Sequence, residues 1–269
     1  MKNRFALALG TAVIMGLGSA SAADLPRKAP IAAPIMAPVY NWTGVYVGVH
    51  AGWGWSDADA FTTFTPSPAA FGVGWTPFGY SHDADGFMAG GQIGFNYQIA
   101  NWVVGLEADL SWADINGGVT VAPLVTFAGV PVAGTLHSSA YDMNWFGTVR
   151  GRLGFAANNL LVYVTGGLAF ADVDYATVSV FPAGTWAGTA SETNAGWTLG
   201  GGFEWGLTPN WSVKAEYLYY DLGDTTVVGL NAAAGPAFTT VTSIDNDGHI
   251  VRIGVNYRFG WGGPVVARY

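Results

Sequence analysis

The chain contains eight stretches in which apolar residues alternate with small or polar ones, at about 42–55, 87–98, 102–113, 140–155, 160–171, 195–207, 211–220 and 248–259. A period of two is typical of β-strands whose two faces meet different surroundings. Each stretch reaches the 9 to 11 or so residues that a tilted strand needs to cross a membrane. Because a hydrocarbon layer offers the backbone no partners, such strands must close on themselves. The pattern therefore predicts an all-β, eight-stranded antiparallel transmembrane β-barrel.

The connections between these stretches are alternately short and long. Three of them comprise only 99–101, 156–159 and 208–210, whereas the others run to roughly 20 to 30 residues, a rhythm typical of short periplasmic turns and long extracellular loops. All 13 prolines lie outside the eight stretches. Since proline cannot donate a hydrogen bond to a sheet, its absence from them supports the strand assignment.

The ends of the chain have a different character from the predicted barrel at 42–259. Residues 1–22 combine two basic residues, an apolar run and four small residues, which indicates a cleaved secretory signal peptide. Residues 23–41 contain a proline at every fourth position and are predicted to form an extended periplasmic linker. Residues 260–269 form a C-terminal tail beyond the last stretch.

The charge balance excludes one class of partner. The chain has 10 Lys and Arg against 18 Asp and Glu, a formal net charge of −8, and removal of Lys2 and Arg4 with the signal peptide leaves 8 against 18, or −10. So acidic a chain does not suit nucleic acid. There is no cysteine, so no disulfide framework is expected.

The charged residues within the stretches are separated by even numbers of positions. They are Glu107 with Asp109, Asp142 with Arg150 and Arg152, Lys214 with Glu216, and Arg252 with Arg258. Even spacing puts them on one face of the pleat. That face is predicted to be the lumen, because a Lys or Arg facing lipid at the bilayer midplane costs about 2 to 4 kcal/mol.

The opposite face is predicted to contact lipid, as in Val45, Val47 and Val49, in Trp102, Val104, Leu106, Ala108 and Leu110, and in Val251, Ile253, Val255 and Tyr257. Aromatic residues gather at both ends of the stretches, where interfacial girdles are expected. The inner girdle comprises Trp42, Tyr97, Trp102, Phe155, Trp205, Trp211 and Phe259, and the outer girdle Trp53, Phe87, Trp112, Tyr141, Phe170, Trp197 and Tyr219.

The charged lumen is the candidate functional site. It comprises Glu107, Asp109, Glu204 and Glu216 with Arg150, Arg152, Lys214, Arg252 and Arg258, and His50 is expected beside them. An eight-stranded barrel is only wide enough for side chains to fill it. Two interpretations stay open, a packed ionic plug and a narrow path for ions or small solutes.

Sites of other kinds have less support in the sequence. The predicted loops carry Asp-x-Asp pairs at Asp57/Asp59, Asp83/Asp85, Asp172/Asp174 and Asp245/Asp247 and no Lys or Arg, so divalent cations could bridge them to anionic lipid. Ser81, His82 and Asp83 combine the side chains of a catalytic triad, but triads normally assemble from distant segments. We therefore predict no catalytic residues, no resident metal and no cofactor.

Five blocks together resemble a known family: NWTGVYVGVHAGWGWS, GFMAGGQIGFNYQIANWVVGLEADLSWA, WFGTVRGRLGFAANNLLVYVTGGLAF, GWTLGGGFEWGLTPNWSVKAEYLYYDLG and HIVRIGVNYRFG. They are similar to the small outer-membrane porin-like β-barrel proteins of Gram-negative bacteria, and within them to the outer-membrane immunogenic protein branch. The resemblance implies an abundant, surface-exposed envelope protein without catalytic residues. Such barrels usually finish on an aromatic of the last strand, here Phe259, whereas this chain continues for ten residues.

These observations predict a structural protein of the cell outer membrane that supports envelope integrity and presents loops outside. The first alternative is a small pore for passive diffusion, and the second is an adhesin or ligand receptor that acts through the loops. The expected partners are outer-membrane lipid, lipopolysaccharide and the outer-membrane assembly machinery. The sequence leaves the oligomeric state open.

Overall fold

The computed structural model describes residues 40–65, 76–124, 129–182, 184–231 and 235–259. The predicted signal peptide, almost all of the predicted linker and the C-terminal tail lie outside these residues. Among the described residues, no helix is long and apolar enough to cross a membrane.

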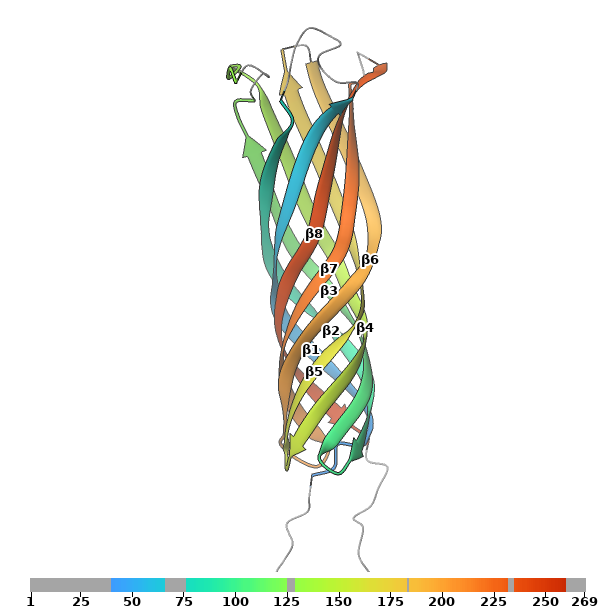
Figure 1. Ribbon diagram of the computed structural model, residues 1–269. Helices are drawn as coiled ribbons and strands as arrows, with labels where there is room; N and C mark the ends of the chain where they lie inside the picture. Colours follow the sequence, from blue (N-terminus) through green and yellow to red (C-terminus); the bar gives the residue numbers. More distant parts are fainter. Residues whose placement is uncertain (1–39, 66–75, 125–128, 183, 232–234, 260–269) are drawn as a thin grey trace, which may run out of the picture. The chain divides into compact units, whose positions relative to one another are not determined.

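The described chain forms one closed ring of antiparallel strands in sequence order, with β8 pairing back to β1 (Figure 1). The eight strands are β1 (Gly44–Thr65), β2 (Phe78–Ile99), β3 (Trp102–Val121), β4 (Leu136–Ala157), β5 (Leu160–Phe181), β6 (Gly184–Gly206), β7 (Trp211–Asn231) and β8 (Gly235–Arg258). The predicted all-β antiparallel barrel is therefore confirmed.

The three predicted short connections are tight turns at one end of the ring. Ile99 pairs with Trp102 and Ala157 with Leu160, so each of these hairpins turns within two residues. Ala100 and Asn158 adopt positive φ values of 53° and 57°, as the first residues of such turns require. Tight turns fix the register of the long strands that follow them.

The alternation along the strands separates two surfaces as predicted. On the outer face Val49, Leu106 and Ile253 are about two-thirds exposed to the surroundings of the barrel. On the inner face Glu107 and Arg252 are 3% and 1% exposed. The barrel thus inverts a soluble protein, with apolar side chains outside and charges inside.

Two girdles of aromatic side chains encircle the outer face, and two of the residues predicted to belong to them do not. Trp102, Phe155 and Trp205 point outward at the end with the tight turns, and Trp53, Phe87, Trp112 and Trp197 point outward about ten residues further along. Trp42 and Tyr141, however, are 1% and 2% exposed and lie inside the ring. Both were predicted from their place along the chain alone, which does not reveal the face.

The strands are much longer than the sequence pattern predicted. In β3, Trp102 and Trp112 mark the two girdles, and the strand continues for nine further residues, 113 to 121. The segments predicted as long loops are therefore largely strand, and Pro236 lies in β8. We call the part beyond the outer girdle the projecting section; it comprises 56–65, 78–86, 113–121, 136–144, 171–181, 184–196, 220–231 and 235–248. The sequence pattern missed these extensions because their outward residues are largely polar, so the apolar alternation stops at the outer girdle.

Asp142 is not a lumen residue, which corrects the prediction. Between Met143 and Trp145, β4 contains one residue more than β5, so a β-bulge at Asn144 reverses the alternation. Arg150 and Arg152 point inward on one side of the bulge, whereas Asp142 is exposed outside the ring on the other. Parity in the sequence predicts a face only while the ladder is unbroken.

Three apolar clusters fill the lumen at different levels. One at the end with the tight turns contains Trp42, Val103, Ala156, Leu161 and Tyr163. A larger one begins level with the outer girdle and extends into the projecting section; its largest members include Met88, Ile115, Tyr141, Met143, Phe146, Tyr175, Leu218, Tyr220 and Ile250. A third contains Phe64, Leu124, Phe181 and Trp186. The charged site lies between the first and the second.

Nitroxide labels test the division between membrane and projecting section, because the chain has no cysteine of its own. A label at Leu106→Cys is expected to collide mainly with oxygen, which concentrates in lipid. A label at Thr226→Cys, exposed on the outer face of β7, is expected to collide mainly with a water-soluble nickel chelate. Equal accessibility of both labels to the nickel chelate in lipid vesicles would contradict this arrangement.

Candidate functional site

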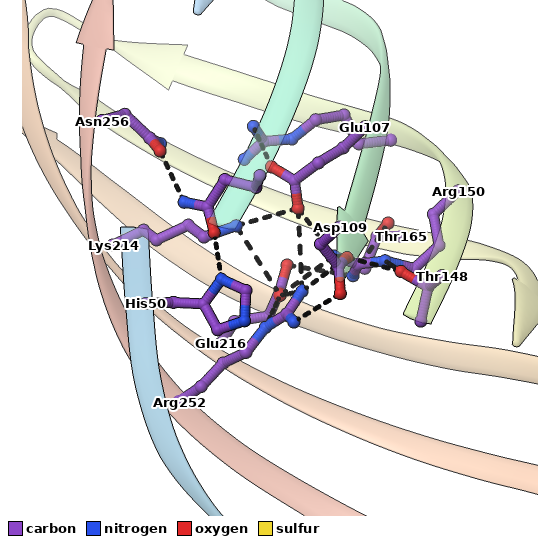
Figure 2. A network of polar contacts seen from close by, with 12 residues as sticks. His50, Glu107, Asp109, Thr148, Arg150, Thr165, Lys214, Glu216, Arg252 and Asn256 are labelled. Atoms are coloured by element: carbon purple, nitrogen blue, oxygen red, sulfur yellow. Dashed lines mark hydrogen bonds and ion pairs between the residues drawn. The ribbon is translucent and has the colours of Figure 1, made fainter. Parts of the chain in front are cut away.

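Five strands bring the predicted charges to one level of the lumen. β3 supplies Glu107 and Asp109, β4 Arg150 and Arg152, β6 Glu204, β7 Lys214 and Glu216, and β8 Arg252. The register already sets opposite charges side by side, since Glu107 faces Arg150, Glu204 faces Lys214 and Glu216 faces Arg252 across neighbouring strands. Figure 2 shows the side chains of Glu107, Asp109, Arg150, Lys214, Glu216 and Arg252 converging from separate strands.

The centre of the site is a network of three acids and three bases. Arg150 Nη2 lies 2.6 Å from Glu107 Oε1 and 3.0 Å from Asp109 Oδ2, and its Nη1 lies 3.1 Å from Glu216 Oε1. Arg252 binds two of these three acids, with Nη1 2.9 Å from Asp109 Oδ1 and Nη2 2.7 Å from Glu216 Oε2. Lys214 Nζ completes the set, 2.8 Å from Glu107 Oε1. The formal charges of these six groups cancel.

A second ion pair lies nearer the tight turns. Arg152 Nη2 is 3.1 Å from Glu204 Oε2, and the Arg152 guanidinium lies 3.9 Å from the centre of the Tyr163 ring. Tyr46 connects this pair to the central network, because its hydroxyl donates to Glu107 Oε2 at 2.7 Å and accepts from Arg152 Nη1 at 3.0 Å. The two groups of charges thus form one hydrogen-bonded unit.

All these charged side chains are 0 to 4% exposed. Taking an ion out of water costs several kcal/mol, and only close partners repay it. Each charge here has at least one partner within 3.1 Å, and most have two or more. The charged side chains bind one another, and none of these described side chains faces a water-filled passage.

Neutral polar side chains extend the network. His50, which was expected beside the charges, bonds with Gln92 through Nδ1 and, at 2.7 Å, with the Ser111 hydroxyl through Nε2. Gln92 Nε2 donates to Asn256, which in turn donates to Glu204 Oε1 at 2.9 Å. Sequence reasoning missed Gln92 and Asn256, although both share the inward parity of their strands.

Two glycines leave room for this packing. A Cβ at Gly94 would lie 2.3 Å from the Tyr46 ring, and a Cβ at Gly48 would lie 2.1 Å from Asn256 Oδ1. Real side chains do not approach so closely. The space beside Gly48 and Gly94 is therefore filled by neighbouring side chains.

Arg258 lies apart from the cluster to which it was predicted to belong. Its Nη2 donates to the backbone carbonyl of Pro209, and its guanidinium lies 4.5 Å from the centre of the Tyr40 ring. Tyr40 packs on Trp42, with ring centres 4.6 Å apart, so the segment before β1 turns into the end of the ring. Arg258, Tyr40 and Trp42 form a cluster between the charged site and the tight turns.

The other candidate sites do not assemble among the described residues. No group of three or more His, Cys, Asp or Glu side chains is placed to hold a metal ion there. Asp57 and Asp83 are register partners, and Asp59 accepts from Ser81 at 2.7 Å, whereas Asp85 pairs with Trp55. His82 points into the lumen while Ser81 and Asp83 are exposed, so these three side chains lie on opposite faces of β2.

The outer face of the described barrel carries acids and no lysine or arginine, because the five described cations, Arg150, Arg152, Lys214, Arg252 and Arg258, are all buried inside. Most of the acids stand in the projecting section, just beyond the outer girdle. Two of them, Asp224 and Asp245, face each other on β7 and β8. Their shared hydrogen bond, then burial and repulsion, raise the pKa of Asp245 to about 6.

Removal of one cation should reveal the network in stability measurements. Arg150→Met leaves three buried carboxylates short of a partner, so we expect it to lower the free energy of unfolding by about 3 to 5 kcal/mol. Arg258→Met, the matched control beside Tyr40, should cost less than half as much, because no carboxylate among the described residues pairs with Arg258. Urea unfolding in lipid vesicles measures both; an Arg150→Met barrel as stable as the wild type would contradict the assignment.

Comparisons with known proteins agree with this geometry. Residues 10–259 match the family model of the outer membrane protein beta-barrel domain. The chain is 34% identical over 263 residues to the 31 kDa outer-membrane immunogenic protein of Brucella melitensis, covering 93% of this chain and 98% of that protein. It is 27% identical to the 25 kDa outer-membrane immunogenic protein of Brucella abortus, covering 90% and 91%.

Among solved structures, the outer membrane protein OprG from Pseudomonas aeruginosa aligns over 83% of this chain and 99% of its own, with a TM-score of 0.46 and 15% identity. The family match and the relatives carry the assignment. The chain belongs to the outer-membrane β-barrel family, is similar to the outer-membrane immunogenic proteins, and is a protein of the cell outer membrane.

Proposed function

We propose that this protein is a structural, non-conducting component of the outer membrane that supports envelope integrity. The observation that carries the proposal is the packing of the lumen. The charges are bound to one another at distances of 2.6 to 3.1 Å, and apolar clusters seal the ring on both sides of them. An ion that entered would have to displace partners from buried charges and then cross a layer of Met, Ile, Leu and Phe.

The pore interpretation makes the same residues a constriction, and the packing speaks against it. A constriction needs charges that face water, whereas these are at most 4% exposed. Tyr46, Gln92 and Asn256 occupy the remaining polar space. The one hydroxyl beside a histidine in the described site, Ser111 next to His50, is buried with that histidine and faces no open pocket, so we propose no enzymatic activity.

Display at the cell surface is the second part of the proposal. The names of the similar Brucella proteins describe them as immunogenic, which fits a barrel whose strands rise nine or more residues beyond the outer girdle. The projecting section presents paired strands to the outside, where the sequence predicted long loops. Adhesion or ligand binding has no comparable observation in its favour.

The proposed partners follow from the outer face. The apolar belt between the girdles fits the acyl chains of outer-membrane lipid, and the projecting acids fit lipopolysaccharide through bridging divalent cations better than through direct contact. For the outer-membrane assembly machinery, the exposed Phe259 directly after β8 offers the last-strand aromatic on which such barrels usually finish, with ten residues following it in this chain.

Planar-bilayer recording tests the closed lumen. The refolded wild-type protein is expected to show no steady single-channel conductance at neutral pH, because no open path passes the ion pairs. A large porin refolded in the same way provides the positive control. A reproducible conductance step whose ion preference follows the charge at Arg150, as shown by an Arg150→Gln variant, would refute the proposal and support the pore.

Labelling of intact cells tests the orientation. A cysteine at Thr226 in the projecting section should react with a membrane-impermeant maleimide, since this position is exposed. A cysteine at Leu207, exposed in the turn between β6 and β7, should react only after the outer membrane is disrupted. The reverse pattern would place the tight turns outside the cell.

A further inference from the structure

Two histidines are buried inside the projecting section, away from the charged lumen. His82 on β2 and His137 on β4 are 1% and 0% exposed. Tyr80 contacts both, its ring centre 5.1 Å from that of each imidazole. His137 has a partner at each nitrogen, the Tyr80 hydroxyl at 2.9 Å and the Ser179 hydroxyl at 2.7 Å, whereas neither nitrogen of His82 makes a hydrogen bond of normal geometry.

Among the described residues around these rings, no acid is buried as a counter-ion. The titratable groups buried or partly buried there are tyrosines, namely Tyr80 on β2, Tyr141 on β4, Tyr175 on β5 and Tyr220 on β7. Three acids act on His82 or on these tyrosines from more exposed positions: Asp83 on β2, Glu192 on β6, whose register partner Val173 faces inward, and Asp247 on β8. The described side chains buried there from β1, β3 and β8 are uncharged, including Ala58, Thr62, Ile115, Thr242, Ile244 and Asn246.

Burial makes both imidazoles poor bases. Loss of water, helped by the charge of His82, lowers the pKa of His137 to about 4, and burial likewise lowers the pKa of His82. In an unfolded chain a histidine has a pKa of about 6.5. The folded section therefore holds fewer protons than the unfolded one below that pH, so its stability is complete above pH 6.5 and falls as the pH drops towards about 4.

One strand contact of the projecting section, which we call the β6–β7 seam, has few backbone register pairs. The β6–β7 ladder runs without a break from Gly206 and Ser212 to Trp197 and Asp221, and its next pair is Ala187 with Leu230. Gly223, with a φ of 71°, bends β7 at the start of this gap. Glu192 is exposed although its parity points inward, and Asn194 reaches Thr225 by a side-chain bond of 3.0 Å.

We propose that the projecting section is an acid-sensitive cap, in which proton uptake by His82 and His137 loosens the strands and parts β6 from β7. Two positive charges would then share the interior of the projecting section, where none of the described carboxylates is buried beside them. The membrane section would stay closed. Its ion pairs join arginine and lysine to carboxylates, groups that ordinarily titrate outside the range of histidine, and its buried histidine, His50, has hydrogen-bond partners in Gln92 and Ser111 and the Asp109 carboxylate among the charges that act on it. The proposal does not depend on whether the lumen conducts.

Distance measurements between paired nitroxides test the proposal in lipid nanodiscs. Labels at Ala187→Cys and Leu230→Cys, register partners exposed across the seam, are expected to move apart and to show a broader distance distribution between pH 6.5 and 4. Labels at Phe203→Cys and Ala215→Cys, register partners of the same two strands in the membrane section, should keep their distance. No change in the first pair, or an equal change in both, would overturn the proposal.

Substitutions identify the titrating groups. The acid response should disappear in a His82→Gln/His137→Gln barrel and persist in His249→Gln, since His249 is partly exposed on the outer face of β8. It should also persist in Asp245→Asn, which removes the raised carboxyl pKa nearby. If the double variant does not fold, each single histidine variant must show a smaller displacement than the wild type. A full response without the two histidines would overturn the proposal.

Discussion

Charges inside a ring of eight strands must neutralise one another, and this requirement organises the rest of the structure. Hydrocarbon outside forces the backbone to close and forces ionised groups inward. The lumen is too narrow to hydrate them, so Arg150 binds three acids at once and Arg252 binds two. The partners come from β3, β4, β7 and β8, so the ion pairs also connect strands that are far apart in the chain.

Closing the lumen has a consequence for function. The lumen holds paired charges with apolar clusters on both sides, and Tyr46 and Asn256 fill the space beside its glycines. The barrel is therefore filled with side chains at these levels. Its value to the envelope would lie in rigidity and in what its outer face meets. The charged groups on that face beyond the outer girdle are all carboxylates, because every described lysine and arginine is buried inside the ring.

The sequence predicted the strands, their order, the tight turns and nearly all of the lumen charges, because lipid and lumen impose a strict period of two. The same rule failed for Asp142, since the bulge at Asn144 is set by the partner strand and not by composition. It could not find the projecting section either, where Thr, Ser and Asp cover the outside. Tyr46 and Gln92 share the charged parity, but only packing shows which atoms they bind.

Nuclear magnetic resonance of the protein in lipid nanodiscs tests the central claim most directly, through contacts of labelled side chains with acyl chains and water. The account predicts acyl-chain contacts for Val104 and Ile253, and guanidinium protons of Arg150 and Arg252 that exchange slowly with water and show no lipid contact. Acyl-chain contacts at Arg252, or rapid exchange of its guanidinium protons with a water-filled lumen, would contradict it.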